Sequence, residues 1–462
     1  MSTTIGSTAP EGTAQHVGHT EGLRAGADHL GRITVLSLSA GAVAAAILVL
    51  VVFAGAAEAV ITGAGLLGFA VGWALLAAMS TRRTARPQGW AAVPAGVMAA
   101  TGSALILLAP GDSTLTSSGW VWGPVMLTLA VWCAVQARRT LDTAARGWLV
   151  LPTLALLALA SIGGVAQTVR VTQDAAAYPP PGRLVDVEGH AMHLDCSGTG
   201  SPTVVLESGL GGTATLWNRI TPQVSPTTRV CAYDRAGQGW SDATDAPRDG
   251  VTIAAELHAL LDNAGEAGPF VLVGHSAGGP YAMTFAAQHP DDVAGMVLLD
   301  ATNPYDVGAS LAGHAGGANG PMALLPSLAR IGAVQLIPAT RWSNLPAPAA
   351  DVYRSQVATA KGAANSVAEM AAYGQAFAQA QQLTTLGARP LVVLTTADKA
   401  ASDPAGYAAQ QRFAALSADS SLRTANTTHT GLLDDPAGSA PTVRAILDTI
   451  AAVQVGTTVP RS

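Results

Sequence analysis

The residues in this sequence best suited to chemistry are Gly274-His275-Ser276-Ala277-Gly278, which directly follow the apolar run 270–273. This order predicts a strand that delivers Ser276 into a sharp turn, with a helix following over about 277–289, so that the serine hydroxyl stands exposed as a nucleophile. The backbone N–H of Ala277 would then point at the reacting oxygen. Because a chain with 50 glycines produces such a pattern by chance, other residues must support it.

A nucleophilic serine needs a neighbouring base, usually a histidine that is oriented by a carboxylate. Of the ten histidines, His429 is the best placed, since it lies in a polar loop after the sheet and before a helix expected at about 440–453. For the carboxylate we prefer Asp398, in the loop that follows the buried run 391–394. Asp300, which ends the preceding strand, is the alternative, because the site of a parallel sheet gathers where its strands end.

The composition indicates that part of the chain lies in lipid. Hydrophobic residues make up 49% of the 462 residues and charged residues only 12%, roughly half the usual charged share. The excess is confined to the first third, where five apolar stretches of about 18 to 22 residues are long enough to cross a bilayer as helices. They lie at about 33–54, 59–79, 91–110, 119–136 and 148–167.

The arginines between these stretches predict their orientation, because short cytoplasmic loops collect Lys and Arg. Two loops are rich in arginine, namely the second (Arg82, Arg83 and Arg86) and the fourth (Arg138, Arg139 and Arg146). The first and third loops have no basic residue. We therefore expect a multi-pass plasma-membrane protein whose tail 1–32 is cytoplasmic and whose remaining chain, after an odd number of spans, is extracytoplasmic.

Beyond a Pro-rich linker at 168–182, short β-branched runs alternate with helix-like segments over 183–455, and a short tail follows at 456–462. This alternation is typical of an α/β fold with a doubly wound, mostly parallel sheet. The expected strands are a hairpin of 183–187 and 191–195, then 203–207, 229–233, 270–273, 295–299 and 390–394. The interval of about 301–388 is expected to be a helical cap that acts as a lid, or one that merely covers the sheet.

Two further motifs accompany the serine pattern. The run Val204-Val205-Leu206-Glu207-Ser208-Gly209-Leu210-Gly211-Gly212 looks like an oxyanion loop, and Tyr233-Asp234-Arg235-Ala236-Gly237-Gln238-Gly239-Trp240-Ser241-Asp242 looks like a D-x-R-x-x-G-x-S loop. With these motifs, residues 183–453 resemble the α/β-hydrolase fold superfamily. The resemblance implies an oxyanion hole formed by the backbone N–H groups of Leu210 and Ala277. The family often has His-Gly where this chain has Ser208-Gly209, so the residue that usually braces the loop is replaced.

The same resemblance bears on the cysteines. In the superfamily's strand order, the strands that carry Cys196 and Cys231 are antiparallel neighbours, which suggests a disulfide in an outward-facing domain. Two buried free thiols are the alternative. Cys133, in the fourth apolar stretch, is expected only to pack.

These observations predict a membrane-anchored serine hydrolase that cleaves an ester, or an amide, through an acyl-enzyme. An acyltransferase would use the same triad, and a non-catalytic membrane sensor or scaffold with a ligand-binding hydrolase fold is the alternative from another class. A small-molecule or lipid-like acyl substrate and the membrane are the expected partners, and nucleic acid is not. No cofactor or metal is expected, because the histidines and cysteines lack metal-ligand spacing and no glycine-rich stretch has a phosphate-binding lysine.

Overall fold

The computed structural model describes residues 14–141, 150–305, 321–336 and 344–461. It divides into two compact units, one of residues 1–110 and 118–165 and the other of residues 111–117 and 166–462. Some of the expected segments lie outside the described residues. They are the start of the N-terminal tail, Arg146 of the fourth loop, the start of the fifth span at Trp148, parts of the cap at 306–320 and 337–343, and Ser462.

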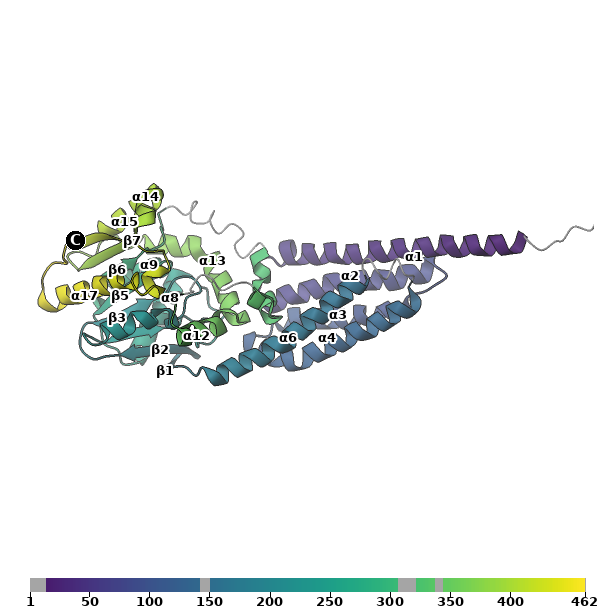
Figure 1. The fold of residues 1–462 in the computed structure, drawn as a ribbon, viewed down its shortest axis with the longest axis horizontal. Coiled ribbons are helices and arrows are strands. Elements are labelled where there is room, and N and C mark those ends of the chain that lie inside the picture. The colour runs from purple at the N-terminus through teal and green to yellow at the C-terminus, as the bar shows by residue number, and fades with distance from the viewer. Residues whose placement is uncertain (1–13, 142–149, 306–320, 337–343, 462) are drawn as a thin grey trace, which may run out of the picture. The chain divides into compact units, whose positions relative to one another are not determined.

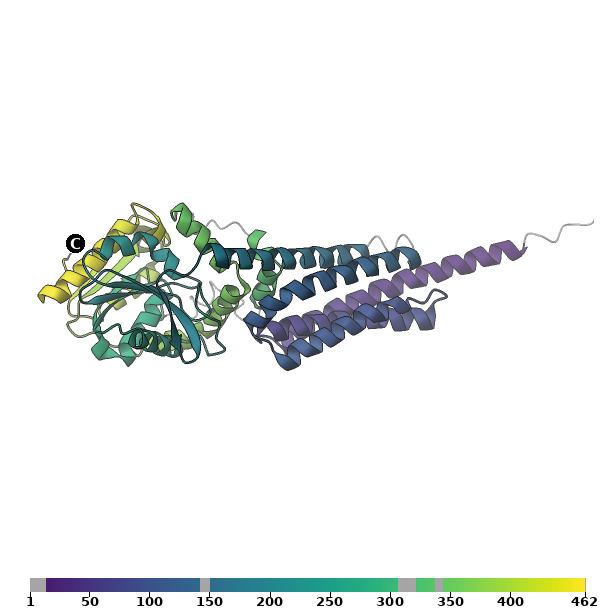
Figure 2. The ribbon, with the colours of Figure 1, turned by 90° about the horizontal axis from the view of Figure 1, so that it is seen from below.

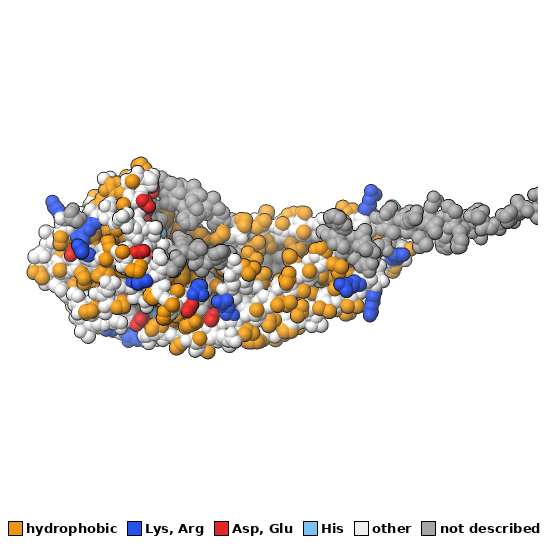
Figure 3. Space-filling model, viewed as in Figure 1, with side chains coloured by type: hydrophobic (Ala, Val, Ile, Leu, Met, Phe, Trp, Pro, Cys, Tyr) orange, Lys and Arg blue, Asp and Glu red, His pale blue; other side chains and the backbone are white. Residues whose placement is uncertain are grey.

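The first unit is built from long helices. Five helices in the described part of the chain are long and apolar enough to cross a membrane, and they coincide with the five apolar stretches of the sequence. In Figure 3, the visible face of these helices is mostly hydrophobic, with Lys and Arg side chains gathered at one end. The helices are α1 (Ala14–Ile47) with its continuation η1 (Leu48–Val52), α2 (Glu58–Arg83), α3 (Ala92–Leu108) with η2 (Gly89–Ala91) before it, α4 (Asp112–Thr140) and α6 (Leu151–Ala177).

Small residues let α1 and α2 approach closely. A Cβ added to Gly72 would lie 3.0 Å from the Cα of Gly41, and one added to Gly68 would collide with the backbone of Ala45. Gly68 and Gly72 form the G-x-x-x-G spacing that permits such contacts between helices in lipid. Side chains at these two positions would force α1 and α2 apart.

The second unit contains one eight-stranded sheet with the order β1-β2-β4-β3-β5-β6-β7-β8. Only β2 runs antiparallel to its neighbours, and β3 to β8 are parallel, as the sequence predicts. One strand, β8, was not expected. The strands are β1 (Arg183–Val187), β2 (His190–Ser197), β3 (Thr203–Glu207), β4 (Val230–Tyr233), β5 (Phe270–His275), β6 (Val293–Leu299), β7 (Leu391–Thr396) and β8 (Ser420–Ala425).

Helices cover both faces of this sheet, which produces two hydrophobic cores (Figures 1 and 2). Successive strand residues point to opposite faces, so Val205 belongs to one core and Val204 to the other. Helices α8 (Gly250–Asn263), α9 (Gly278–Gln288) and α15 (Pro404–Ala414) contribute to the first core, and α7 (Thr221–Val224), α16 (Gly431–Asp434) and α17 (Ser439–Val455) to the second. The sheet is therefore buried on both sides, as its near-continuous apolar strands require.

Between β6 and β7 the described residues form the expected helical cap. Its longest helix, α13, packs its Tyr373 and Phe377 against Tyr281 of α9 and Ile253 of α8. The cap elements are η6 (Pro321–Leu324), α11 (Leu325–Arg330), η7 (Ala333–Leu336), α12 (Ala347–Val357) and α13 (Ala360–Ala380).

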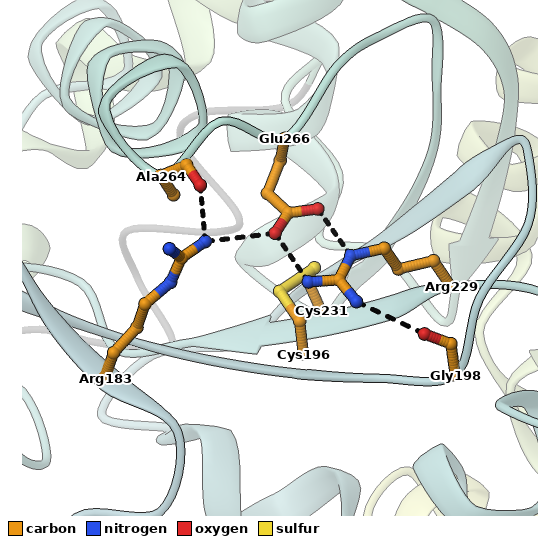
Figure 4. Close-up of a disulfide and its surroundings, with 7 residues drawn as sticks. All are labelled: Arg183, Cys196, Gly198, Arg229, Cys231, Ala264 and Glu266. Carbon is orange, nitrogen blue, oxygen red and sulfur yellow. Dashed lines mark hydrogen bonds and ion pairs between the residues drawn. A yellow bond between two sulfur atoms is a disulfide. The ribbon is translucent and has the colours of Figure 1, made fainter.

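Cys196 and Cys231 are directly opposite each other in the antiparallel pair β2 and β4, and their sulfur atoms form a disulfide. The expectation of a bridge is therefore confirmed. Figure 4 shows Glu266 beside it, where its carboxylate accepts hydrogen bonds from Arg229 at 2.6 and 2.7 Å and from Arg183 at 3.1 Å. The hydrogen bonds from Arg229 are the main reason that the pKa of Glu266 is lowered.

Candidate active site

Ser276 stands at the turn between β5 and α9 with a φ of 55°, in the left-handed region that a non-glycine residue adopts only when its surroundings impose it. The flanking glycines make this turn sterically possible. A Cβ on Gly274 would lie 2.7 Å from the Cα of Gly279, and a Cβ on Gly278 would lie 2.8 Å from the carbonyl oxygen of Ser208. The sequence therefore produces the strained strand-to-helix turn expected around a nucleophile.

The carboxylate that contacts His429 is Asp300, and not Asp398. His429 Nδ1 lies 2.5 Å from Oδ2 of Asp300, whose side chain is 2% exposed. Because a carboxylate only accepts, Nδ1 is the protonated nitrogen, and Nε2 of the neutral ring is left with a lone pair that can take a proton. Asp300 and His429 thus have the relation of an orienting acid to its base.

Our preference for Asp398 is wrong, for a reason that lies in the local helix. The side chain of Thr396 accepts a hydrogen bond from the N–H of Lys399, which caps α14 (Ala397–Ser402) immediately after β7. Successive helical residues point about 100° apart. Asp398 is exposed, whereas Lys399 reaches Asp300.

Three groups therefore bind the Asp300 carboxylate. Besides His429, the Lys399 ammonium lies 2.8 Å from Oδ1, and the Thr395 hydroxyl donates to Oδ1 at 2.7 Å. Burial alone would raise the pKa of Asp300, but the hydrogen bond from His429 and the charge of Lys399 outweigh it and hold this pKa well below the usual range. Lys399 could not be identified from the sequence, because its partner Asp300 is 99 positions away, at the end of another strand.

His275 supports the loop that carries His429. Its Nε2 lies 3.0 Å from the carbonyl oxygen of His429, and the two rings lie 4.6 Å apart. His275 is 1% exposed and immediately precedes Ser276. This contact fixes the His429 loop next to the turn of the serine.

The loop after β3 passes close to the serine. A Cβ on Gly209 would lie 3.0 Å from the Cβ of Ser276. Of the two residues expected to supply oxyanion donors, Ala277 belongs to a buried apolar cluster and Leu210 packs against this cluster. The structure thus brings Ser276, His429, Asp300, Leu210 and Ala277 together and leaves Asp398 outside.

Ser208 braces this loop in place of the usual histidine. Its hydroxyl accepts a hydrogen bond from Trp217 Nε1 at 2.9 Å and donates to the carbonyl oxygen of Thr213 at 3.2 Å. Ser208 and Trp217 are both buried. The departure from the common pattern therefore keeps the loop supported through a different side chain.

Arg235 supports the oxyanion loop and donates hydrogen bonds from all five of its N–H groups. It donates to the carbonyl oxygens of Ser208 and Gly209 at 2.6 and 2.8 Å, to Glu207 at 2.6 Å, and twice to Glu369 at 2.9 and 3.0 Å. Glu369 belongs to α13, so this guanidinium joins the cap to the oxyanion loop. A guanidinium is the side chain able to satisfy so many acceptors at once.

The comparisons with known proteins agree with this fold. The family model described as alpha/beta hydrolase fold matches residues 202–436, just over half of the chain. The chain belongs to the alpha/beta hydrolase fold family. Among solved structures, a Pseudomonas aeruginosa protein provisionally named an epoxide hydrolase aligns with a TM-score of 0.50 at 19% identity, over 59% of this chain and 96% of its own.

Curated relatives of this hydrolase-fold chain match over shorter segments. The lipase LipV of Mycobacterium tuberculosis is 40% identical over 110 residues, 24% of this chain and 41% of the lipase. A Bacillus subtilis protein called YbdG is 29% identical over 133 residues, 28% of this chain and 41% of YbdG. The probable transporter efuK of Hormonema carpetanum is 34% identical over 130 residues, 26% of this chain and 19% of efuK. The match spans less than half of each relative's own length.

In this hydrolase-fold domain, Asp234 of the run 233–242 is a structural anchor. Asp234 accepts hydrogen bonds from the N–H groups of Ala214 and Trp240 at 2.7 and 3.0 Å, and it lies 2.9 Å from Nδ1 of His193. The other ring nitrogen of His193 lies 2.7 Å from the carbonyl oxygen of Pro181. Both ring nitrogens face acceptors, so the site favours the protonated ring.

This arrangement predicts a loss of stability as the pH rises. Burial opposes the charge on His193, but the hydrogen bond and the charge of Asp234 outweigh it, and the pKa of His193 is raised. The contribution of protonated His193 to the free energy of unfolding is therefore complete below the unfolded pKa of about 6.5. It is lost as the pH rises through the folded pKa, at up to about 1.4 kcal/mol per pH unit. Thermal unfolding of the detergent-solubilised protein between about pH 6 and 9 measures this loss.

The matched variant is His193→Gln, which cannot take up a proton. We expect its melting temperature to be lower than that of the wild type near pH 6 and the difference to shrink towards pH 9. A difference that stays constant over this range would contradict the assignment.

Proposed function

We propose that this chain is a membrane-anchored serine hydrolase that cleaves an ester through an acyl-enzyme. The observation that carries the proposal is the Asp300–His429 pair beside the strained turn of Ser276. Nε2 of His429 takes the proton of the Ser276 hydroxyl as its oxygen attacks the acyl carbonyl, and then gives this proton to the leaving alcohol. Water, activated by the same nitrogen, releases the acid.

The backbone N–H groups of Leu210 and Ala277 stabilise the negative oxygen that develops during each attack. Removal of one such donor typically costs about 3 kcal/mol of transition-state stabilisation. A serine nucleophile separates this site from members of the family that use aspartate, such as the dehalogenase and epoxide-hydrolase branches. The local match to a lipase is consistent with acyl transfer to water.

An apolar acyl group suits the surroundings of the serine. The partly buried side chains of Leu210 and Met370 pack against a cluster that contains Ala277, Tyr373 and Phe377. Met370, Tyr373 and Phe377 all belong to α13 of the cap. The cap therefore presents a hydrophobic face beside the oxyanion loop, which favours acyl chains over charged substrates.

A fluorophosphonate probe tests the nucleophile directly, because it phosphonylates an activated serine. We expect the full-length protein in detergent to be labelled, Ser276→Ala to lose the label, and the exposed-serine control Ser402→Ala to keep it. A wild-type protein that is folded but unlabelled would contradict the enzyme proposal and favour a ligand-binding sensor or scaffold. If the wild type is labelled, a further assay adds an alcohol together with an ester substrate. Hydrolysis then releases the free acid, whereas acyl transfer forms a new ester with the added alcohol.

We also propose that the five candidate spans anchor the protein in the plasma membrane with the hydrolase domain outside. Arg82 and Arg83 end α2, and Arg138 and Arg139 end α4, which is the distribution of a cytoplasmic surface. An epitope placed after Ser462 should be removed by protease added to spheroplasts, whereas the same epitope before Met1 should be protected. The reverse pattern would overturn the orientation.

A further inference from the structure

A second cluster of titratable side chains lies away from the proposed active site. His258 of α8, His289 at the end of α9, and Asp292 of η5 (Pro290–Asp292) place one ligand atom each within 4.8 Å of one another. His258 Nε2 is 3.2 Å from Asp292 Oδ2, and the two imidazole rings lie 4.0 Å apart with an angle of 13° between their planes. His258 lies 34 positions before Asp292 and meets the other two residues only in the folded domain.

We propose that this cluster binds a Zn²⁺ ion. Zinc takes imidazole nitrogen and carboxylate oxygen at about 2.0 to 2.2 Å in tetrahedral geometry, which spaces the ligand atoms about 3.3 Å apart. The distance between His258 and Asp292 already has this value. Because the lone pair of an imidazole nitrogen lies in the plane of its ring, binding requires the two rings to rotate out of their stacked arrangement until both planes contain the ion. Three protein ligands leave the fourth position to water.

The donor set of the cluster suits a cation. Two imidazole nitrogens and one carboxylate oxygen are ligand types that Zn²⁺ binds. The Asp292 carboxylate supplies one negative charge. A bound Zn²⁺ would therefore replace the stacked pair of imidazoles with an arrangement in which a nitrogen lone pair of each ring binds the same ion.

The local backbone positions two of the ligands in advance. Asp292 follows His289 by three residues, with Pro290 between them, and the N–H of Asp292 donates to the carbonyl oxygen of His289 at 3.1 Å. The buried ring of Phe285 lies 5.0 Å from that of His289 and 6.2 Å from that of His258. The side chains of His258 and Asp292 are 41% and 38% exposed, so an ion has access from solvent.

The site is separate from the proposed catalysis. It lies at the C-terminal end of α9, whereas Ser276 precedes the N-terminal end, and the 11 residues of α9 rise about 16 Å in all. The ion would link α8 to α9 and thus stabilise the helix that follows the serine. Its role is that of a structural clip.

The test is zinc titration of the full-length protein in detergent, prepared without a polyhistidine tag and stripped with EDTA. We expect the wild type to bind one more Zn²⁺ per chain than the double variant His258→Gln/His289→Gln, and to gain melting temperature with zinc where this variant does not. Asp292→Asn should weaken this site at least about tenfold. The control His190→Gln should behave as the wild type.

Equal zinc stoichiometry and equal melting shifts in the wild type and the double variant would overturn the proposal and leave the cluster as a stacked His–Asp contact only. A cooperative melting transition of the zinc-free double variant shows whether its domain is folded. Because neither this transition nor zinc binding depends on serine chemistry, failure of the metal site and failure of the proposed hydrolase activity remain distinguishable. The zinc titration itself needs no turnover.

Discussion

Replacement of Asp300 by asparagine is expected to lower kcat/KM for an activated ester by about four orders of magnitude, as loss of the acid does in a Ser-His-Asp site. Asparagine keeps the shape of the side chain but presents an amide to His429 Nδ1. The ring can then adopt the other tautomer, in which Nδ1 accepts a hydrogen bond from the amide and Nε2 carries the proton. A protonated Nε2 cannot act as the base for Ser276. Steady-state hydrolysis measures the loss.

The matched variant is Asp398→Asn, which makes the same replacement of a carboxylate by an amide at an exposed residue of α14. It should stay within about twofold of the wild type, because Asp398 does not contact His429. If Asp398→Asn abolished turnover and Asp300→Asn did not, the assignment of the acid would be wrong. Thermal unfolding of both variants shows whether a loss of activity reflects a loss of fold.

Replacement of Arg235 by methionine is expected to destabilise the hydrolase domain by about 3 to 5 kcal/mol, since it leaves buried carboxylates without their partner. Glu207 and Glu369 would face each other without a cation, and two carbonyl groups of the oxyanion loop would lose their donor. The corresponding drop in melting temperature is roughly 10 °C for a domain of this size. Differential scanning fluorimetry in detergent measures it.

The combined variant Arg235→Met/Glu207→Gln/Glu369→Gln separates charge from packing. Removal of both carboxylate charges should recover part of the lost stability, because the cost comes from the unpaired anions. Burial, the largest influence, already raises the pKa of Glu207 against the opposing charge of Arg235. If Arg235→Met alone left the melting temperature unchanged, the proposed link between cap and oxyanion loop would be refuted.

The sequence was most informative where one physical signal dominates. The strands at the centre of the sheet are short, mostly apolar runs bounded by turn residues, and β3 and β5 are buried along their entire length. The turn of Ser276 was also predictable, because the close backbone contacts at positions 274 and 278, two residues to either side, require glycine. By contrast, β8 carries Ser420, Ser421, Arg423 and Thr424 and lies at the edge of the sheet, where half-polar sequences are tolerated and the apolar signal is weak.

The choice between the two aspartates shows where pattern alone is insufficient. Asp300 and Asp398 both follow buried apolar strands, so each reaches the end of the sheet where a site gathers. What separates them is side-chain direction, which depends on the helix that begins at Ala397. Thr396 is a residue type that favours helix N-caps, and this signal could have indicated that the loop after β7 is a helix.

Long-range polar contacts were out of reach for a different reason. Arg235 and Glu369 are 134 positions apart, and neither residue's type nor its neighbours specify the other. Their pairing depends on how the cap lies over the sheet. A single sequence carries no direct signal for such packing, whereas the local turn around Ser276 follows from adjacent residues.

The oxidation state of Cys196 and Cys231 also depends on the compartment in which the domain folds, because a disulfide persists only outside the reducing cytosol. The chain has three cysteines, and Cys133 is the one that is unpaired among the described residues. Thiol alkylation of denatured, unreduced protein taken from cells would add one group per chain if the bridge had formed and three if the domain had stayed among cytosolic reductants. A mass measurement would thus report the side of the membrane without cutting the chain.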